Sequence, residues 1–517
     1  MKRTILFLGL LLLSFPLLFA QGYKIEVQIK GLKNQQIILG HHKGENLIPD
    51  DTVKTDAKGY GVFKGDSLLR KGLYFIYLPN TKYFDFIVGN DQNFFIKTDT
   101  TDLIKNLKIL NSLENDIFLK YQDMLFSHNK KISELRKQLQ QTKDEKKRKQ
   151  IEQKISKLID EFEAYYKKTI TQYPNLYITE FIKATHEISI PKNITDKKAQ
   201  YYYYRNHYFD NFNFIDLLYT PFYFTRIDRF LDKVLIQDPD TLNAEIDKML
   251  AKAKPDPEAY KSLLIHLFNK YAKSQLMIAE NVYVHLAEIY IRDAYWSDKD
   301  FISRLKTKIA RKKNCLIGNK APNLVLNLLP NDSSKIELLR APLEELREKG
   351  LQIEKDTTRT FEQKIPDLSN LIAEFMANMP DQIVLDTIKS KYTILWFMSP
   401  SCSHCIHETP LFYKMYLKDL KDKGVTVITI YLEKNTDNWR AFTKDIGKWF
   451  DFIEKHHFYK WYNTWNPFAN VRFYYDISST PVLYLLDENK KIIAKRIGYE
   501  QAKEIIFDLE KEKNKQK

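Results

Sequence analysis

The sequence predicts a three-part chain: an N-terminal antiparallel β-sandwich, a central all-α segment, and a C-terminal α/β domain that carries a helical insertion. Short alternating runs broken by Gly, Asn and Asp fill residues 21–105. Apolar residues three and four apart dominate 106–315. From 316 to 517, strand and helix patterns alternate, with a polar helical insertion at about 335–380. A chain of 517 residues, 44% hydrophobic and 14% aromatic, can bury a separate core in each part.

Residues 1–20 have the layout of a secretory signal peptide. Lys2 and Arg3 precede an apolar run that Pro16 interrupts, and Ala20 stands before the polar Gln21. The run is short for a membrane span, and no other window is long enough for one. We expect cleavage after Ala20 and an exported mature chain without a transmembrane span, located in the periplasm or cell envelope. An uncleaved anchor is the alternative.

The β-rich part contains two adjacent histidines, His41 and His42, at the end of a strand-like run. Neighbouring residues of a strand point to opposite faces, so we do not expect them to share a metal ion. We expect both to be surface residues.

The central part is helical and strongly charged. Its densest run, residues 129–168, alternates lysines with acids over a narrow apolar stripe, which predicts one long solvated helix or a helical hairpin. The net charge of +15 is spread over the whole chain rather than gathered in one patch, so no nucleic-acid partner is expected. The tyrosine-rich run at 201–214 predicts a packed aromatic layer.

The C-terminal part predicts a central sheet covered by helices. The patterns indicate strands at 321–329, 382–388 and 392–398, followed by a helix after the cysteines at 407–424. A strand at 425–433, a helix at 437–447, a hairpin at 482–498 and a last helix at 500–511 complete the order.

Only three cysteines occur in the chain: Cys315, Cys402 and Cys405. Two of them form a C-x-x-C pair, which in an exported protein indicates redox chemistry or a metal rather than structural bracing. A helix N-terminus favours a thiolate, so Cys402 is the candidate nucleophile and Cys405, one turn further, the resolving thiol. We expect Cys315 to be a buried or semi-buried free thiol, with intermolecular pairing as the alternative.

Residues 397–410 also contain side chains that could bind a metal ion or act in a peroxidase. Cys402, His404, Cys405 and His407 lie close together, but a structural zinc site usually takes a second ligand pair from a distant segment, and no second cysteine pair exists. A peroxidase would need a threonine before a single cysteine, and "WFMSPS" has none. The sequence therefore predicts a redox dithiol with no metal and no cofactor.

Three stretches, "IGNKAPNLVL", "ILWFMSPSCSHCIHETP" and "SSTPVLYLLDENKKIIAKRI", resemble the TlpA/ResA-like thiol-disulfide oxidoreductases, which have a thioredoxin fold. The resemblance covers 316–517 apart from the insertion. It implies a cis Pro481 against Cys402, with Thr480 offering its backbone to an extended substrate. The two earlier parts resemble domains of unassigned function that often precede such a domain.

The resemblance also implies a role for Glu408, which stands near the active site in these proteins and could tune the cysteine pKa values or relay a proton. Trp396 stands where thioredoxin has a buried aspartate, which makes Glu408 the better proton acceptor. A solvated first-turn carboxylate is the alternative.

His404 suggests the direction of the reaction. A histidine before the second cysteine also occurs in strongly oxidising Dsb-type proteins, which leads to the hypothesis that His404 stabilises the thiolate and makes the dithiol less reducing than thioredoxin. ResA-like proteins generally act as reductants, which opposes this hypothesis, and a solvent-facing His404 would change little.

The predicted function is that of an exported thiol-disulfide oxidoreductase whose partners are protein thiols or disulfides and a membrane or periplasmic redox protein. The alternative is a cell-envelope binding or assembly protein in which the thioredoxin-like domain is a docking module with weak redox activity.

Overall fold

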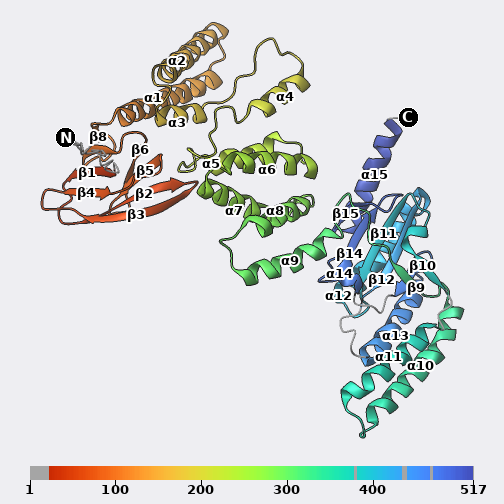
Figure 1. The fold of residues 1–517 in the computed structure, drawn as a ribbon. Helices are drawn as coiled ribbons and strands as arrows, with labels where there is room; N and C mark the ends of the chain where they lie inside the picture. Colours follow the sequence, from red (N-terminus) through yellow and green to blue (C-terminus); the bar gives the residue numbers. More distant parts are fainter. Residues whose placement is uncertain (1–21, 378–380, 433–438, 466–469, 516–517) are drawn as a thin grey trace, which may run out of the picture. The chain divides into compact units, whose positions relative to one another are not determined.

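The computed structural model describes residues 22–377, 381–432, 439–465 and 470–515. They form two compact units, one of residues 1–237 with 244–263 and one of 238–243 with 264–517 (Figure 1). The predicted signal peptide lies outside the described residues. Among the helices that are described, none combines the length and the apolar character needed to cross a bilayer.

The first unit begins with two four-stranded sheets in its described residues. One has the order β4-β1-β7-β8 and the other β3-β2-β5-β6. Alternate side chains of β1 and β7 are buried, and side chains of both sheets contribute to one shared apolar core. The strands are β1 (Tyr23–Lys30), β2 (Gln36–Lys43), β3 (Asn46–Lys54), β4 (Tyr60–Gly65), β5 (Gly72–Tyr77), β6 (Tyr83–Val88), β7 (Asn93–Asp99) and β8 (Lys108–Leu110).

The prediction of a wholly antiparallel sandwich is wrong at one pairing. Strands β1 and β7 run parallel, with Lys24 opposite Asn93 and Lys30 opposite Asp99. Between these two strands the chain builds all of the second sheet, and a connection of that length can bring it back in the same direction.

The expectation that His41 and His42 are surface residues is also wrong. Both are buried in β2, an inner strand of its sheet. His41 pairs with Asp50 through Nδ1 at 2.8 Å and stacks on Tyr219, whereas His42 pairs with Asp85 through Nε2 at 2.8 Å. A buried imidazole needs such a partner, and each histidine has its own carboxylate because the two point to opposite faces.

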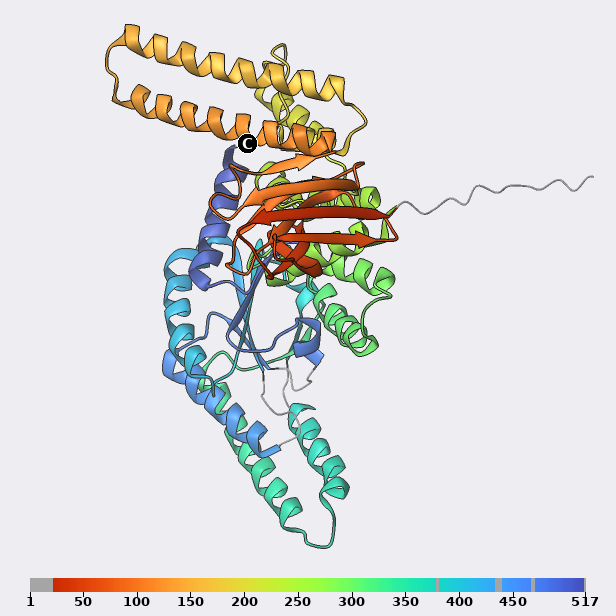
Figure 2. The ribbon, with the colours of Figure 1, turned by 90° about the vertical axis from the view of Figure 1, so that its left-hand side faces the viewer.

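Helices make up the rest of the first unit, and the charged run forms a hairpin rather than one long helix (Figure 2). Ser112 and Asp144 cap the two long helices by accepting hydrogen bonds from backbone N–H groups. The helices are α1 (Leu113–Gln141), α2 (Glu145–Gln172), α3 (Tyr177–Thr185), α4 (Lys197–His207), α5 (Tyr223–Arg229) and α6 (Pro239–Ala253), and α7 (Pro257–Lys273) continues into the second unit.

The predicted aromatic layer lies in the second half of the tyrosine-rich run. Tyr208, Phe212 and Phe214 are buried and contact other rings, including Phe230. The first half of the run forms α4, in which no residue is buried.

The second unit contains a seven-stranded sheet, in the part of the chain that is described, with the order β10-β9-β13-β12-β11-β14-β15. Strand β11 is central and buried throughout; it pairs in parallel with β12 and antiparallel with β14. The strands are β9 (Val325–Leu328), β10 (Gln382–Val384), β11 (Tyr392–Met398), β12 (Val425–Tyr431), β13 (Tyr462–Trp465), β14 (Val482–Leu486) and β15 (Ile492–Lys495).

Two apolar clusters cover the faces of this sheet. One includes Trp396 and Phe412, and the other includes Leu395 and the fully buried, free Cys315, as the sequence predicted for this thiol. The insertion forms two helices, of which α10 packs against α13. The helices of this unit are α8 (Ala279–Asp293), α9 (Lys299–Lys313), α10 (Ser333–Lys355), α11 (Phe361–Ala377), α12 (Ser403–Met415), α13 (Trp439–His456), α14 (Asn470–Tyr474) and α15 (Tyr499–Lys515).

Candidate active site

The two cysteines stand where the central strand β11 passes into helix α12. After the strand, the chain makes a tight turn in which the Cys402 N–H donates to the Ser399 carbonyl at 3.1 Å. Cys402 has extended backbone angles and is the N-cap of α12, and its carbonyl accepts from the Ile406 N–H at 3.0 Å. The Cys402 side chain is half-buried, whereas Cys405, one turn into the helix, is fully buried, and both thiols are free. Only Cys402 can be approached by a substrate.

Several hydrogen bonds stabilise Cys402 as a thiolate. Burial raises the pKa of Cys402, but the N–H and thiol of Cys405, the Thr480 side chain and the backbone N–H of His404 all donate to the sulfur. Together these donors bring the pKa of Cys402 below its ordinary value. These backbone groups belong to the first turn of the helix, where N–H groups have no intrahelical acceptor.

The pKa of Cys405 is displaced in the opposite direction. Burial, and to a smaller extent the neighbouring Cys402, raise the pKa of Cys405 to about 12, although the Ser399 N–H donates to its sulfur at 3.5 Å. Cys402 therefore ionises more readily than Cys405, which keeps its proton at neutral pH.

A distant segment completes the site. The Thr480–Pro481 peptide bond is cis, and the Cys402 thiol donates to the Thr480 carbonyl at 3.3 Å. The predicted cis bond and its position against Cys402 are confirmed. Strand β14 begins directly afterwards and pairs with β11, and this pairing brings residues 480–481 beside the cysteine turn.

Trp396 and Thr409 form a hydrogen-bonded pair of uncharged side chains below the dithiol. The indole N–H of the buried Trp396 donates to Thr409 Oγ1 at 3.0 Å, and Thr409 is itself fully buried. The position where thioredoxin has an aspartate is thus occupied by a tryptophan whose indole N–H has a hydrogen-bond partner.

The ionisable side chains of α12 other than the cysteines contact the two sulfurs less than the backbone groups do. The side chains of His404 and His407 are exposed, so the group of His404 that contacts the sulfur is its backbone N–H. Glu408 is half-buried and faces Tyr499, whose pKa is raised by burial and then by this carboxylate. Within the described residues, Glu408 makes no hydrogen bond to either sulfur, and no group of three or more His, Cys, Asp or Glu side chains is arranged to hold a metal ion.

Lys448 was not predicted to lie at the site. Its ammonium, on α13, donates to the Ser401 hydroxyl at 3.1 Å, directly beside Cys402. No local pattern links a lysine of that helix to the cysteine turn. Only its spacing on an amphipathic helix that covers the sheet could have suggested it.

Comparisons with known proteins match only parts of the chain. The model of a family described as a domain of unknown function (DUF5106) matches residues 136–310. No curated protein matches the sequence.

Several solved structures are similar to part of the chain. A thioredoxin-like protein from Bacteroides caccae is 17% identical, with 62% of this chain and 97% of that one covered and a TM-score of 0.39. The thioredoxin domain of a thiol-disulfide oxidoreductase from Bacteroides vulgatus is 24% identical, with 25% and 86% covered and a TM-score of 0.21. A thiol:disulfide interchange protein from a Bacteroides species is 26% identical, with 24% and 77% covered and a TM-score of 0.20. Because these scores are low, a function for this chain depends on the geometry of its own site.

Proposed function

We propose that the protein is a thiol-disulfide oxidoreductase that exchanges disulfides with protein substrates through Cys402 and Cys405. The observation that carries this proposal is a pair of free thiols within one helical turn, of which Cys402 is accessible at the helix N-terminus and Cys405 is fully buried. The lowered pKa of Cys402 and the raised pKa of Cys405 agree with this arrangement. An attacking thiol must be accessible and ionised, and a resolving thiol must be close but unreactive until it is needed.

The chemistry proceeds in two exchanges. The Cys402 thiolate attacks one sulfur of a substrate disulfide, the substrate S–S bond breaks, and the leaving thiolate takes up a proton. Cys405 then loses its proton and attacks the Cys402 sulfur of the mixed disulfide, which releases the second substrate thiol. The substrate gains two electrons and two protons, and Cys402 and Cys405 end as a disulfide. The reverse sequence oxidises a substrate dithiol.

In this proposal, Thr480 and Pro481 form the wall against which an extended substrate segment lies. The Thr480 carbonyl is within hydrogen-bonding distance of the Cys402 sulfur, so a segment paired with the backbone there would present its sulfur to Cys402. Glu408, the nearest carboxylate on α12, is the proposed acceptor of the Cys405 proton, by way of a water molecule since no direct hydrogen bond joins them.

We further propose that the chain acts in the periplasm or cell envelope and that a membrane or periplasmic redox protein restores the dithiol. The basic and apolar leader at 1–20 supports export. An oxidising compartment would also supply disulfide substrates.

The test compares serine variants of all three cysteines in an insulin-reduction assay and a dithiol-oxidation assay. We expect Cys402→Ser to abolish turnover and Cys405→Ser to accumulate a mixed disulfide that can be isolated by non-reducing electrophoresis. Cys315→Ser is the control, because this thiol is fully buried and distant in sequence from the dithiol; it should keep activity if it folds. Undiminished turnover in Cys402→Ser would refute the enzyme and favour the docking-module alternative.

A further inference from the structure

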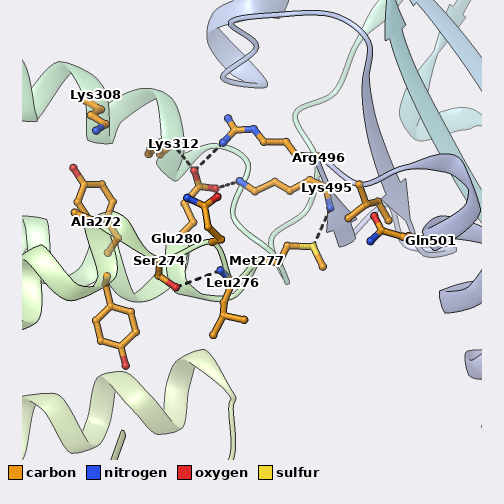
Figure 3. Close-up of a pocket in the computed structure, with 14 residues that line it drawn as sticks. Ala272, Ser274, Leu276, Met277, Glu280, Lys308, Lys312, Lys495, Arg496 and Gln501 are labelled. Carbon is orange, nitrogen blue, oxygen red and sulfur yellow. Dashed lines mark hydrogen bonds and ion pairs between the residues drawn. The ribbon is translucent and has the colours of Figure 1, made fainter. Parts of the chain in front are cut away.

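The second unit contains a pocket of ≈ 580 Å³ away from the two cysteines. Figure 3 shows helices and the end of strand β15 meeting around it. Its walls combine cations, polar groups and apolar side chains: Tyr271, Ala272, Ser274, Gln275, Leu276, Met277, Glu280, Tyr283, Lys308, Lys312, Lys495, Arg496, Ile497 and Gln501. A volume of this order suits a small molecule, since ligand pockets usually measure about 300–1,000 Å³.

One carboxylate, Glu280 of α8, lies at the centre of the charged wall. It pairs with Lys312 at 2.5 Å, with Arg496 at 3.3 Å and with Lys495 (Figure 3). Burial raises the pKa of Glu280, but these cations, Lys495 first, bring it below its ordinary value, so the carboxylate is ionised at neutral pH. Lys495 is almost fully buried and also donates to the Cys315 carbonyl at 2.6 Å.

The positive charges outnumber the negative ones. Asp476, behind the wall, pairs with Lys312 at 3.0 Å, Arg496 at 2.6 Å and Arg311 at 3.4 Å. Counted over the described residues, four cations, Arg311, Lys312, Lys495 and Arg496, share the two carboxylates Glu280 and Asp476. Lys308, which also lines the pocket, is a fifth cation of this cluster. A partly enclosed excess of positive charge raises the local concentration of anions.

Lys308 is the cation that the protein itself does not neutralise. It is exposed on α9, and its ammonium lies 5.3 Å from the centre of the Tyr283 ring. In the part of the chain that is described, it forms no ion pair with a carboxylate, unlike Lys312 one turn further along the same helix. It can thus bind an anion without breaking an existing pair.

We propose that this pocket binds a small organic anion that carries a carboxylate or phosphate group. Lys308 and the outer face of Arg496 would bind the charged group, with Ser274 and Gln501 as further hydrogen-bonding partners. The N-terminus of α15, which begins at Tyr499 next to this wall, adds a favourable dipole. Leu276, Met277 and Ile497 would contact the hydrocarbon part of the ligand.

The experiment titrates the mature chain with glutarate and with glycerol 3-phosphate by calorimetry, and uses the neutral analogues glutaramide and glycerol as controls. We expect saturable binding of at least one anion and none of its neutral analogue. Which anion binds distinguishes a carboxylate ligand from a phosphate ligand.

Two lysine variants locate the site. Lys308→Gln should weaken binding about fivefold, a typical effect of one partly exposed charge contact. Lys306→Gln, an exposed lysine of the same helix outside the pocket, should leave affinity unchanged. Within the described residues, neither lysine forms an ion pair whose loss would affect folding. Absence of saturable binding of both anions, equal binding of the neutral analogues, or equal affinity of Lys308→Gln and wild type would overturn the proposal.

Discussion

Backbone groups supply much of the electrostatics of the dithiol. The N–H groups of Cys405 and His404 donate to the Cys402 sulfur, and the Ser399 N–H donates to the Cys405 sulfur. These donors depend on the conformation of the turn rather than on the side chains of residues 403 and 404. Substitutions there should therefore change the reactivity of Cys402 less than substitutions that alter the turn itself.

The pH dependence of alkylation tests the asymmetry of the two thiols. The reactive species is the thiolate, so the rate at Cys402 should rise with pH and reach half its maximum at a lower pH than the rate at an ordinary cysteine does. Cys405, whose pKa is about 12, should stay unmodified over this range. Iodoacetamide labelling of the reduced protein followed by peptide mass spectrometry gives both rates. Faster labelling of Cys405 than of Cys402 would reverse the assigned roles.

The reduction potential of His404→Ala tests the histidine hypothesis. Because the imidazole is exposed and the backbone N–H remains in the variant, we expect a change smaller than about 30 mV, which corresponds to a tenfold change in the equilibrium constant. His407→Ala, another exposed histidine of α12, is the control in the same glutathione titration. A larger fall in His404→Ala alone would show that the imidazole stabilises the thiolate, as the sequence suggested.

At this scale, the sequence could predict the residues whose role is local. The C-x-x-C spacing identifies Cys402 and Cys405, and the motif before the hairpin identifies Thr480 and Pro481. Lys448 and the paired state of His41 and His42 could not be predicted, since they depend on contacts between segments far apart in the chain.

At the scale of elements, β11 and α12 are held together beneath the dithiol by the Trp396–Thr409 hydrogen bond. Both side chains are buried, so the indole N–H has no water to replace a lost acceptor. This bond fixes the helix against the strand that leads into the cysteine turn.

Thr409→Val should therefore destabilise the protein by about 1–3 kcal/mol, the cost of leaving a buried donor unsatisfied. The free energy of unfolding in urea measures the effect, and Thr307→Val on the exposed side of α9 should change it by no more than about 0.5 kcal/mol. Equal stability of the two variants would mean that the indole finds another acceptor.

The elements that the sequence could not predict are short or non-local. Strand β13 is a four-residue stretch, Tyr-Asn-Thr-Trp, with no clear alternation, and it exists because β12 and β9 pair with it on either side. The parallel pairing of β1 with β7 likewise depends on a long connection, whereas the long helices and the central strand β11 have periodic patterns of their own.

At the scale of the whole described chain, Glu280 joins elements that are far apart in sequence within the second unit. It connects α8 to α9 through Lys312 and to the end of β15 through Lys495 and Arg496. A carboxylate shared by three cations, two of them largely buried, cannot be removed without leaving positive charge uncompensated.

Glu280→Gln should consequently lower the free energy of unfolding of this unit by about 3–5 kcal/mol at neutral pH. Glu288→Gln is the matched control on the same helix, because its pair with Lys313 is exposed and should contribute less than about 1 kcal/mol.

The pH dependence of stability tests the same carboxylate. The pKa of Glu280 is lower in the folded protein than in the unfolded chain. Its contribution to the free energy of unfolding is therefore complete above the unfolded pKa and is lost as the pH falls through the folded pKa. The stability difference between wild type and Glu280→Gln should therefore shrink on acidification, as urea titrations at neutral and acidic pH would show. A difference that stays constant, or one no larger than that of Glu288→Gln, would mean that packing rather than this carboxylate holds α8 and α9 to the sheet.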